Sequence, residues 1–259
     1  MTKALLGSSG FVGSTLMRQA HFDAALRSHN AAEVGLREFD TVVCAAAPGQ
    51  KWLANRHPDA DRQSVDRLIA HLRTVQCKTF VLISTVDVFK HPVGVDEDTP
   101  VEEDGLHPYG LHRRLLEQFV AGHFENHLIV RLPGLVGPGL RKNVIFDLHN
   151  DNNLGGIDSR GVFQFYPMVN LWWDIQAAQG AGLKLVHLTA APISVAAVAE
   201  LGFGRPFDQP QANPPGNYDL RSRHAALFGA SGAYQYTRRD TLQAVRAYAQ
   251  SEPVAGAAP

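Results

Sequence analysis

The feature that most constrains this sequence is a glycine-rich segment between a short apolar run and a helical pattern. Lys3–Leu6 has the length and composition of a buried strand, and Ser14–Ala20 has the pattern of a helix. Between them stands Gly7-Ser-Ser-Gly10-Phe-Val-Gly13. A strand, a glycine-rich turn and a helix in this order predict the first unit of an α/β fold.

The spacing of the three glycines suits a dinucleotide. Gly7 permits a tight turn, and Gly10 allows the backbone to approach a pyrophosphate, whose charge meets the amides at a helix N-terminus. Gly13 lets the helix pack closely on the strand. The same trio is compatible with a purely structural turn, but its position between strand and helix favours dinucleotide binding.

Strands and helices alternate along the first half of the chain. Further strands are expected at Phe22–Leu26, Thr41–Ala47, Phe80–Ile83 and His127–Leu132, and helices at Asp59–Val75 and Leu111–Val120. This alternation predicts a parallel sheet with crossover helices. We therefore expect an α/β protein with a Rossmann-type, doubly wound parallel sheet and a small C-terminal lobe.

The pattern changes after Pro138, and the following segment is rich in Gly, Asn and Asp. We expect a Rossmann domain over residues 1–138, with 166–189 returning to it, and a substrate-binding lobe made of most of 139–259. Within the second half, helices are expected at Trp172–Ala181, Ser194–Leu201 and Arg238–Ala249, and a strand at Leu183–Leu188. Ser251–Pro259 has no periodicity and is expected to be a frayed tail.

Composition and charge argue against several functional classes. The net charge is −1, which gives no electrostatic basis for binding nucleic acid, and no apolar run has the length of a membrane span. Cys44 and Cys77 lie in apolar stretches without a secretion signal, so we expect buried free thiols in a cytoplasmic protein rather than a disulfide. His123 and His127 lack a third ligand, so no metal site is expected.

Five segments, in order, resemble extended short-chain dehydrogenase/reductases of the NAD-dependent epimerase/dehydratase family. Gly7–Gly13 resembles the cofactor loop, and Phe39–Ala46 resembles a strand followed by an alanine-rich cofactor loop. Leu82–Phe89 resembles the strand that carries the family's Ser or Thr. Pro108–Arg113 resembles the Tyr-x-x-x-Lys helix start, and Arg131–Pro138 resembles a conserved turn of the family.

The resemblance implies an NAD(P) cofactor and a small-molecule substrate, a nucleotide sugar or a related hydroxyl or carbonyl compound. The implied cofactor contacts are Gly7, Ser9, Gly10, Phe11, Val12, Gly13, Ala45, Ala46, Tyr109, Arg113 and Pro133. A homodimer through Asp59–Val75 and Leu111–Val120 is also expected, because members of the family often associate through the corresponding helices.

The end of the second expected strand indicates which dinucleotide is preferred. An NAD site needs a carboxylate there to accept from the adenosine ribose, whereas this chain has Arg27 and Ser28. Both suit a 2′-phosphate, so we predict a preference for NADP over NAD. The alternative is that Arg27 only lines the edge of the adenine.

The resemblance places the reacting centre at Tyr109 and Arg113. Four residues apart at a helix start, they share one face. In the family the tyrosine is the acid or base, and a lysine fixes the cofactor ribose and lowers the tyrosine pKa. Arg113 replaces that lysine, keeping the charge but unable to release a proton. The alternative is a surface tyrosine and an arginine paired with Glu117.

Two residues of the next segment complete the expected catalytic set. The resemblance implies that Thr85 hydrogen-bonds the substrate oxygen, although a β-branched residue is also ordinary in a strand. Asp87 is expected on the same side of that strand and corresponds to an acidic residue of sugar-nucleotide dehydratases, which makes it a candidate second acid or base. It could equally be a strand-end residue bonded to nearby backbone.

The function implied by the resemblance is NAD(P)-dependent redox chemistry by an epimerase, dehydratase or ketoreductase. The alternative is a non-catalytic NADP(H)-binding sensor or regulator, which the missing lysine would favour.

Overall fold

The computed structural model describes residues 1–254 and divides into two compact units. The first contains Met1–Lys90, Thr99–Leu132 and Trp172–Val186. The second contains His91–Asp98, Pro133–Leu171 and the chain from His187 onward. The segment that returns to the first unit is thus Trp172–Val186, and a short piece of the first half, His91–Asp98, belongs to the second unit.

The first unit is built on a six-stranded sheet with the order β10-β6-β4-β3-β1-β2. Its strands are β1 (Lys3–Leu6), β2 (Ala24–Leu26), β3 (Phe39–Cys44), β4 (Cys77–Thr85), β6 (His127–Leu132) and β10 (Leu185–His187). The pairs β1–β2, β1–β3, β3–β4 and β4–β6 are parallel. The chain leaves β1 to one side for β2 and then crosses to the other side for β3, which confirms the doubly wound α/β fold.

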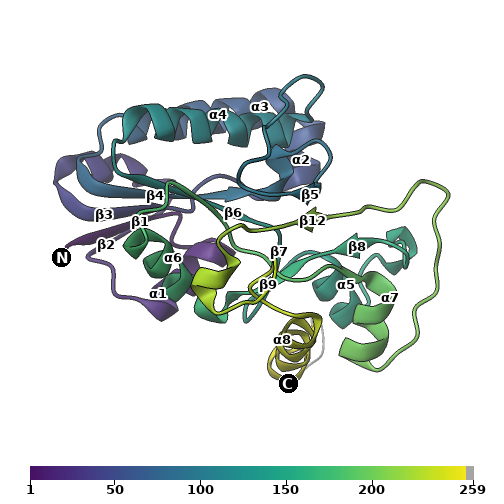
Figure 1. Cartoon of the computed structure of the whole chain (residues 1–259). Helices are drawn as coiled ribbons and strands as arrows, with labels where there is room; N and C mark the ends of the chain where they lie inside the picture. The colour runs from purple at the N-terminus through teal and green to yellow at the C-terminus, as the bar shows by residue number, and fades with distance from the viewer. Residues whose placement is uncertain (255–259) are drawn as a thin grey trace. The chain divides into compact units, whose positions relative to one another are not determined.

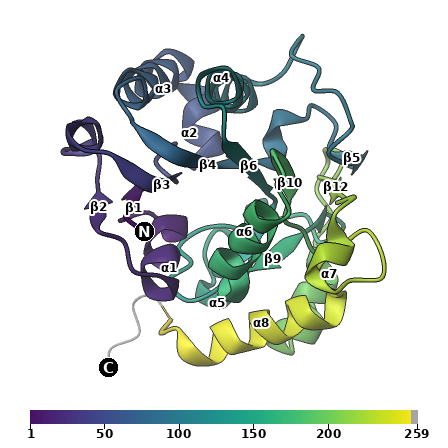
Figure 2. The same ribbon diagram turned by 60° about the vertical axis from the view of Figure 1, so that its left-hand side comes forward.

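Helices cover both faces of this sheet (Figures 1 and 2). α3 (Pro58–Leu72) and α4 (Pro108–His123) lie side by side on one face, while α1 (Phe11–Gln19) and α6 (Leu171–Gly180) lie on the other. The short helix α2 (Lys51–Arg56) follows the loop after β3 and contacts α3 and α4. Pro58 and Pro108 each stand in the first turn of their helix, where a missing N–H costs nothing.

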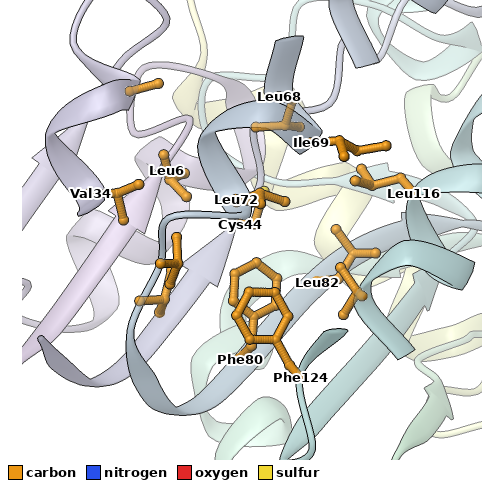
Figure 3. Packing of buried hydrophobic residues seen from close by; sticks show 14 of the residues in the cluster. Leu6, Val34, Cys44, Leu68, Ile69, Leu72, Phe80, Leu82, Leu116 and Phe124 are labelled. Carbon is orange, nitrogen blue, oxygen red and sulfur yellow. The ribbon is translucent and has the colours of Figure 1, made fainter. Parts of the chain in front are cut away.

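A buried apolar cluster holds α3 and α4 to the sheet (Figure 3). Leu68 and Leu72 lie on the inward stripe of α3, and Leu116 does so on α4. The ring of Phe80 on β4 stacks on that of Phe124, with centroids 4.1 Å apart and planes inclined by 7°. The helical spacing of these residues therefore fixes which face of each helix is buried, and with it the direction of the polar residues at the helix starts.

The second unit contains short strands and helices. Three two-stranded sheets pair β11 with β8, β12 with β5 and β7 with β9. Its elements are β5 (Val93–Val95), β7 (Gly134–Val136), α5 (Val144–Asn150), β8 (Val162–Phe163), β9 (Phe165–Pro167), β11 (Ile193–Ser194), α7 (Val195–Ala197), β12 (Asp219–Leu220) and α8 (Arg238–Ser251).

Most expected elements of the first unit are present, with shifted ends. The predicted strand Thr41–Ala47 starts earlier and ends at Cys44. In the second unit, the predicted helix Ser194–Leu201 is instead a short α7 followed by a π-helical turn. The expected frayed tail begins too early, because Ser251 is the last residue of α8; Ala255–Pro259 lie outside the described residues. Among residues 1–254, no helix is long and apolar enough to cross a membrane.

Both cysteines are free thiols, as expected. Cys44 is buried, whereas Cys77 is only half-buried, because it is the first residue of β4 rather than part of its interior. Burial raises the pKa of both thiols to about 11. Neither is therefore a thiolate at neutral pH.

Candidate active site

The glycine-rich loop follows β1 and contacts the backbone at the carboxyl ends of β2 and β3. Gly7 has a φ of +83°, and its N–H donates to the carbonyl of Leu26 at the end of β2 over 2.9 Å. A Cβ on Gly7 would collide with the Ala45 carbonyl after β3, and one on Gly13 would collide with the Gly7 carbonyl. Both positions are thus restricted to glycine by close backbone approach.

The N-terminus of α1 is accessible. Gly10 is its N-cap residue and, having no side chain, makes no capping hydrogen bond. Ser9 and Gly10 are exposed, and only the Gly7 carbonyl oxygen, at 3.5 Å, lies near a Cβ built on Gly10. An accessible, uncapped helix N-terminus suits a pyrophosphate, so this loop fits the phosphates of a dinucleotide. Phe11 and Val12, the other predicted contacts of this loop, form the first turn of α1.

The other predicted cofactor residues follow strands of the same sheet. Arg27 and Ser28 come directly after β2 and are exposed. Ala45 and Ala46 come directly after β3, and the Ala45 N–H donates to the Leu6 carbonyl over 2.9 Å. Pro133 directly follows β6 and is the residue at which the second unit resumes. Because these strands are parallel, their carboxyl ends share one edge of the sheet, where ligands of such folds bind.

Tyr109, Thr85 and Asp87 are brought together at this edge. β4 ends at Thr85, and Asp87 lies in the following 3₁₀ turn, Val86–Val88. The expectation that Asp87 continues the strand is therefore wrong, but the turn still places its carboxylate beside Thr85, with the Thr85 hydroxyl donating to it over 3.4 Å. Tyr109 is buried in the first turn of α4, and the Thr85 side chain is one of the groups that act on its phenol.

Burial controls the protonation of Tyr109. Loss of solvent raises the pKa of the phenol, and the charge of Asp87 raises it further. The positive charges of Arg113 and Lys51 and the polar side chain of Thr85 act in the opposite direction without cancelling the rise. The phenol is therefore protonated at neutral pH and can act as an acid.

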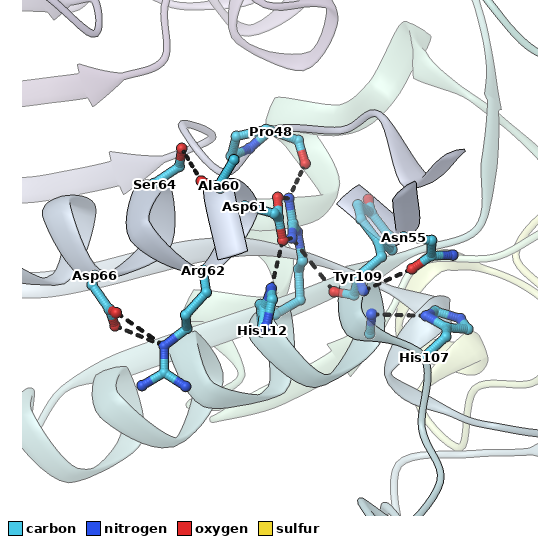
Figure 4. Close-up of polar contacts among 12 residues, drawn as sticks. Pro48, Asn55, Ala60, Asp61, Arg62, Ser64, Asp66, His107, Tyr109 and His112 are labelled. Atoms are coloured by element: carbon cyan, nitrogen blue, oxygen red, sulfur yellow. Dashed lines mark hydrogen bonds and ion pairs between the residues drawn. The ribbon is translucent and has the colours of Figure 1, made fainter. Parts of the chain in front are cut away.

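Arg113 is bound by a buried carboxylate of α3 rather than by Glu117. Its guanidinium forms a two-point ion pair with Asp61, one arm of which is 2.9 Å long, and also donates to the Pro48 carbonyl. Asp61 and its other partner, His112, appear in Figure 4, where the His112 Nδ1 lies 2.7 Å from the carboxylate. The predicted alternative, an Arg113–Glu117 pair, is wrong, because Glu117 binds Arg131 and Ser84 of the sheet.

The guanidinium of Arg113 remains close to Tyr109 in spite of this pairing. Its central carbon is 4.2 Å from the centroid of the tyrosine ring, a cation–π distance. Its Nε is buried and makes no hydrogen bond. Arg113 is thus placed as a cation against the ring, with its two terminal nitrogens already bound to the protein.

The model of the NAD dependent epimerase/dehydratase family matches residues 4–156, which include the glycine loop, Thr85, Tyr109 and Pro133. The chain belongs to the NAD dependent epimerase/dehydratase family. No curated protein matches the sequence significantly.

Solved structures share the fold of this epimerase/dehydratase family member. A dTDP-4-dehydrorhamnose reductase from Clostridium acetobutylicum has a TM-score of 0.74 at 17% identity, covering 96% of this chain and 99% of that one. RMD from Pseudomonas aeruginosa, complexed with NADPH, has a TM-score of 0.72 at 18% identity, covering 97% and 99%. UDP-glucose 4-epimerase from Thermotoga maritima, with UDP-glucose, has a TM-score of 0.71 at 14% identity, covering 96% and 98%.

Several polar residues of this family member's site were not predicted from the sequence. Asp61 pairs with Arg113, Lys51 pairs with Asp87 over 2.6 Å, and Asn55 accepts the Tyr109 backbone N–H over 3.0 Å. For Asp61 a signal existed, because it stands four residues before Val65 on the apolar stripe of α3, where a carboxylate requires a partner. Lys51 and Asn55 belong to α2, which has no apolar periodicity, so no signal pointed to them.

A second buried cluster fixes α4 behind the site. Arg131 of β6 binds Glu117 through two hydrogen bonds of 2.9 and 2.7 Å, and Ser84 of β4 donates to the same carboxylate over 2.6 Å. Glu117 is completely buried, and Arg131 is almost so. Because Glu117 lies two turns after Tyr109 on α4, and Ser84 precedes Thr85, this cluster sets the position of the phenol relative to the threonine.

Proposed function

We propose that this chain is an NAD(P)-dependent oxidoreductase, epimerase or dehydratase that acts on a nucleotide sugar, with Tyr109 as the acid or base. The observation that carries the proposal is the buried Tyr109 phenol beside the Thr85 hydroxyl, at the same sheet edge as an accessible glycine loop. A helix can begin without a buried phenol beside a hydroxyl, so packing alone does not account for this pair. The pair has the geometry of an acid poised to protonate a substrate oxygen.

The proposed cofactor site combines the glycine loop with the strand ends beside it. The amides of α1 and Gly10 would hold the pyrophosphate, Arg27 and Ser28 would face the adenosine ribose, and Ala45 and Ala46 would line the dinucleotide. When bound, the nicotinamide exchanges a hydride with a carbon of the substrate. NADPH in the related Pseudomonas aeruginosa structure and UDP-glucose in the Thermotoga maritima epimerase support this assignment.

Each catalytic residue has a proposed task. Tyr109 gives its proton to a substrate carbonyl during reduction or takes one from a hydroxyl during oxidation, while Thr85 hydrogen-bonds the same substrate oxygen. The raised pKa of the phenol keeps it protonated at neutral pH, as an acid for carbonyl reduction must be. Arg113 would act as a fixed cation that stabilises the ionised phenol. Asp87 would be a second acid or base, and the second unit would bind the sugar.

The proposed preference for NADP rests on Arg27, which lies exposed after β2. We expect NADPH to bind more tightly than NADH, and Arg27→Asp to weaken NADPH binding by about 1–3 kcal/mol through loss of a charge-assisted contact. Fluorescence titration of both cofactors measures this. Arg239→Asp, at an exposed arginine of α8, is the matched control. Equal affinity of the unmutated protein for NADPH and NADH would contradict the preference.

We also propose a homodimer with an isologous contact through α3 and α4. The outer face of α3 carries the ion pair between Arg62 and Asp66, with an N–O distance of 3.0 Å, so the contact would be polar at its rim. Light scattering at micromolar concentrations is expected to give twice the mass of the chain. A monomer at all concentrations would contradict the proposal.

The function itself is tested by supplying UDP- and dTDP-linked 4-keto and 4-hydroxy sugars with NADPH or NAD and following cofactor absorbance and product sugar by mass spectrometry. Turnover of one of these supports the enzyme and identifies its reaction. Tight binding of NADPH without turnover of any of these sugars would instead support the sensor.

A further inference from the structure

A lysine that the family resemblance did not indicate stands at the reacting centre. Lys51, the first residue of α2, places its ammonium 2.6 Å from one carboxylate oxygen of Asp87. The other oxygen of Asp87 accepts from the Thr85 hydroxyl over 3.4 Å, and the Thr85 side chain is one of the groups that lower the pKa of the Tyr109 phenol. Lys51, Asp87 and Thr85 thus form a polar chain, and the Thr85 side chain at its inner end acts on the Tyr109 phenol.

This chain runs from a buried group to solvent. Tyr109 is 8% exposed, the side chain of Asp87 is 16% exposed, and that of Lys51 is 37% exposed. Exposure therefore increases along the chain, and the ammonium at its end exchanges protons with water. All four residues belong to the first unit, and each is held by a separate element of it.

Arg113 cannot provide the same connection. Its guanidinium is 3% exposed, paired with Asp61, and does not release a proton at any ordinary pH. It contributes a fixed charge near the phenol, whereas Lys51 contributes a charge that can also give up a proton and recover it. A single lysine could supply both a positive charge and an exchangeable proton, whereas here Arg113 supplies the fixed charge and Lys51 the exchangeable proton.

We propose that Lys51 is a positioning residue for proton transfer at Tyr109, and that the Lys51–Asp87 pair connects the phenol to solvent through the Thr85 hydroxyl. After Tyr109 has protonated a substrate oxygen, the Thr85 hydroxyl turns from Asp87 to the phenolate and gives it a proton. In the same step the Lys51 ammonium gives a proton to the Asp87 carboxylate, Asp87 passes it to the Thr85 oxygen, and the Lys51 amine then takes a proton from water. The net transfer is one proton from solvent to Tyr109, and the reverse order serves oxidation. This inference rests on the proposed function.

Two variants separate the charge of Lys51 from its proton. Lys51→Met removes both, and Lys51→Arg keeps the charge but cannot release a proton. We expect both to lower kcat by about 10²-fold, with KM little changed and the pH dependence of kcat altered. Lys78→Met is the matched control, because Lys78 forms an equally short ion pair with Asp40, at 2.6 Å, near the amino ends of the strands. Unchanged kcat in Lys51→Met, or full kcat in Lys51→Arg, would overturn the proposal.

A second measurement needs neither cofactor nor substrate. His107, the N-cap residue of α4, has a pKa lowered first by burial and then by the charge of Lys51, whereas Asp87 raises it. NMR titration of His107 is therefore expected to give a higher pKa in Lys51→Met than in the unmutated protein, and no change in Lys51→Arg or Lys78→Met. An unchanged pKa in Lys51→Met would show that the ammonium is not at the site, which overturns the proposal.

The two proposals can fail separately. If the unmutated protein turns over none of the supplied sugars, the proposed function fails, and the role of Lys51 in proton transfer fails with it. If the unmutated protein is active and Lys51→Met is equally active, only the role of Lys51 is lost.

Discussion

Tyr109→Phe is expected to lower kcat by about 10²–10⁴-fold while leaving NADPH affinity unchanged, because phenylalanine fills the same space but has no proton to transfer. The phenol is buried in the first turn of α4, so no water has ready access to replace it. The remaining rate would depend on hydride transfer without general acid catalysis.

The measurement compares kcat, KM and cofactor affinity for Tyr109→Phe with those for Tyr248→Phe. Tyr248 is also buried, and its hydroxyl donates to the Leu140 carbonyl over 3.3 Å within the second unit. This control removes a buried phenol hydroxyl outside the proposed centre, so both variants should bind NADPH, and only Tyr109→Phe should lose turnover. Full turnover by Tyr109→Phe would assign the acid to another residue, of which Asp87 is the nearest candidate.

Glu117→Ala is expected to destabilise the protein by about 3–5 kcal/mol, because it leaves the buried guanidinium of Arg131 without its carboxylate. The same change removes the acceptor of the Ser84 hydroxyl and one partner of Arg114. Glu117, Arg131 and Ser84 are all buried, so the polar groups that lose their partner lie away from solvent.

Denaturant unfolding of Glu117→Ala and of Glu103→Ala tests this expectation. Glu103 forms exposed contacts with Arg114 and Gln118, and its loss is expected to cost about 0–1 kcal/mol. A loss below about 1 kcal/mol in Glu117→Ala would indicate that the pair is not buried in solution. If the alanine variant does not fold, Glu117→Gln, which preserves shape and can still bond Ser84, should give a smaller but measurable loss.

The parts of the fold that could be predicted are those encoded by local pattern. The strand, glycine turn and helix at Lys3–Gln19 and the apolar stripe of α3 follow directly from residue spacing, because each depends on neighbours within a few turns. The short strands of the second unit could not be predicted in this way, because two or three residues are too few to show the alternation of buried and exposed side chains.

The same distinction between local pattern and long-range contact applies to the residues of the candidate site. Tyr109 and Thr85 were found because they lie in segments that resemble the family, and the structure places them together. The partner of Arg113 was missed because Asp61 lies 52 positions away, and the Lys51–Asp87 pair spans 36 positions. Contacts at such separations depend on how helices are placed on the sheet, which sequence spacing alone does not specify.

The two-point pair between Arg113 and Asp61 changes how this site can be engineered. Installing the family's lysine at position 113 replaces a planar fork by a single ammonium, which cannot occupy both Asp61 oxygens and the Pro48 carbonyl in the same geometry. The substitution would therefore leave a buried carboxylate on α3 with incomplete hydrogen bonding. Lysine alone at position 113 would then destabilise the protein, although it is the usual residue of the family there. Positions 61 and 113 should therefore be changed together, with a lysine at position 113 and a neutral residue at position 61.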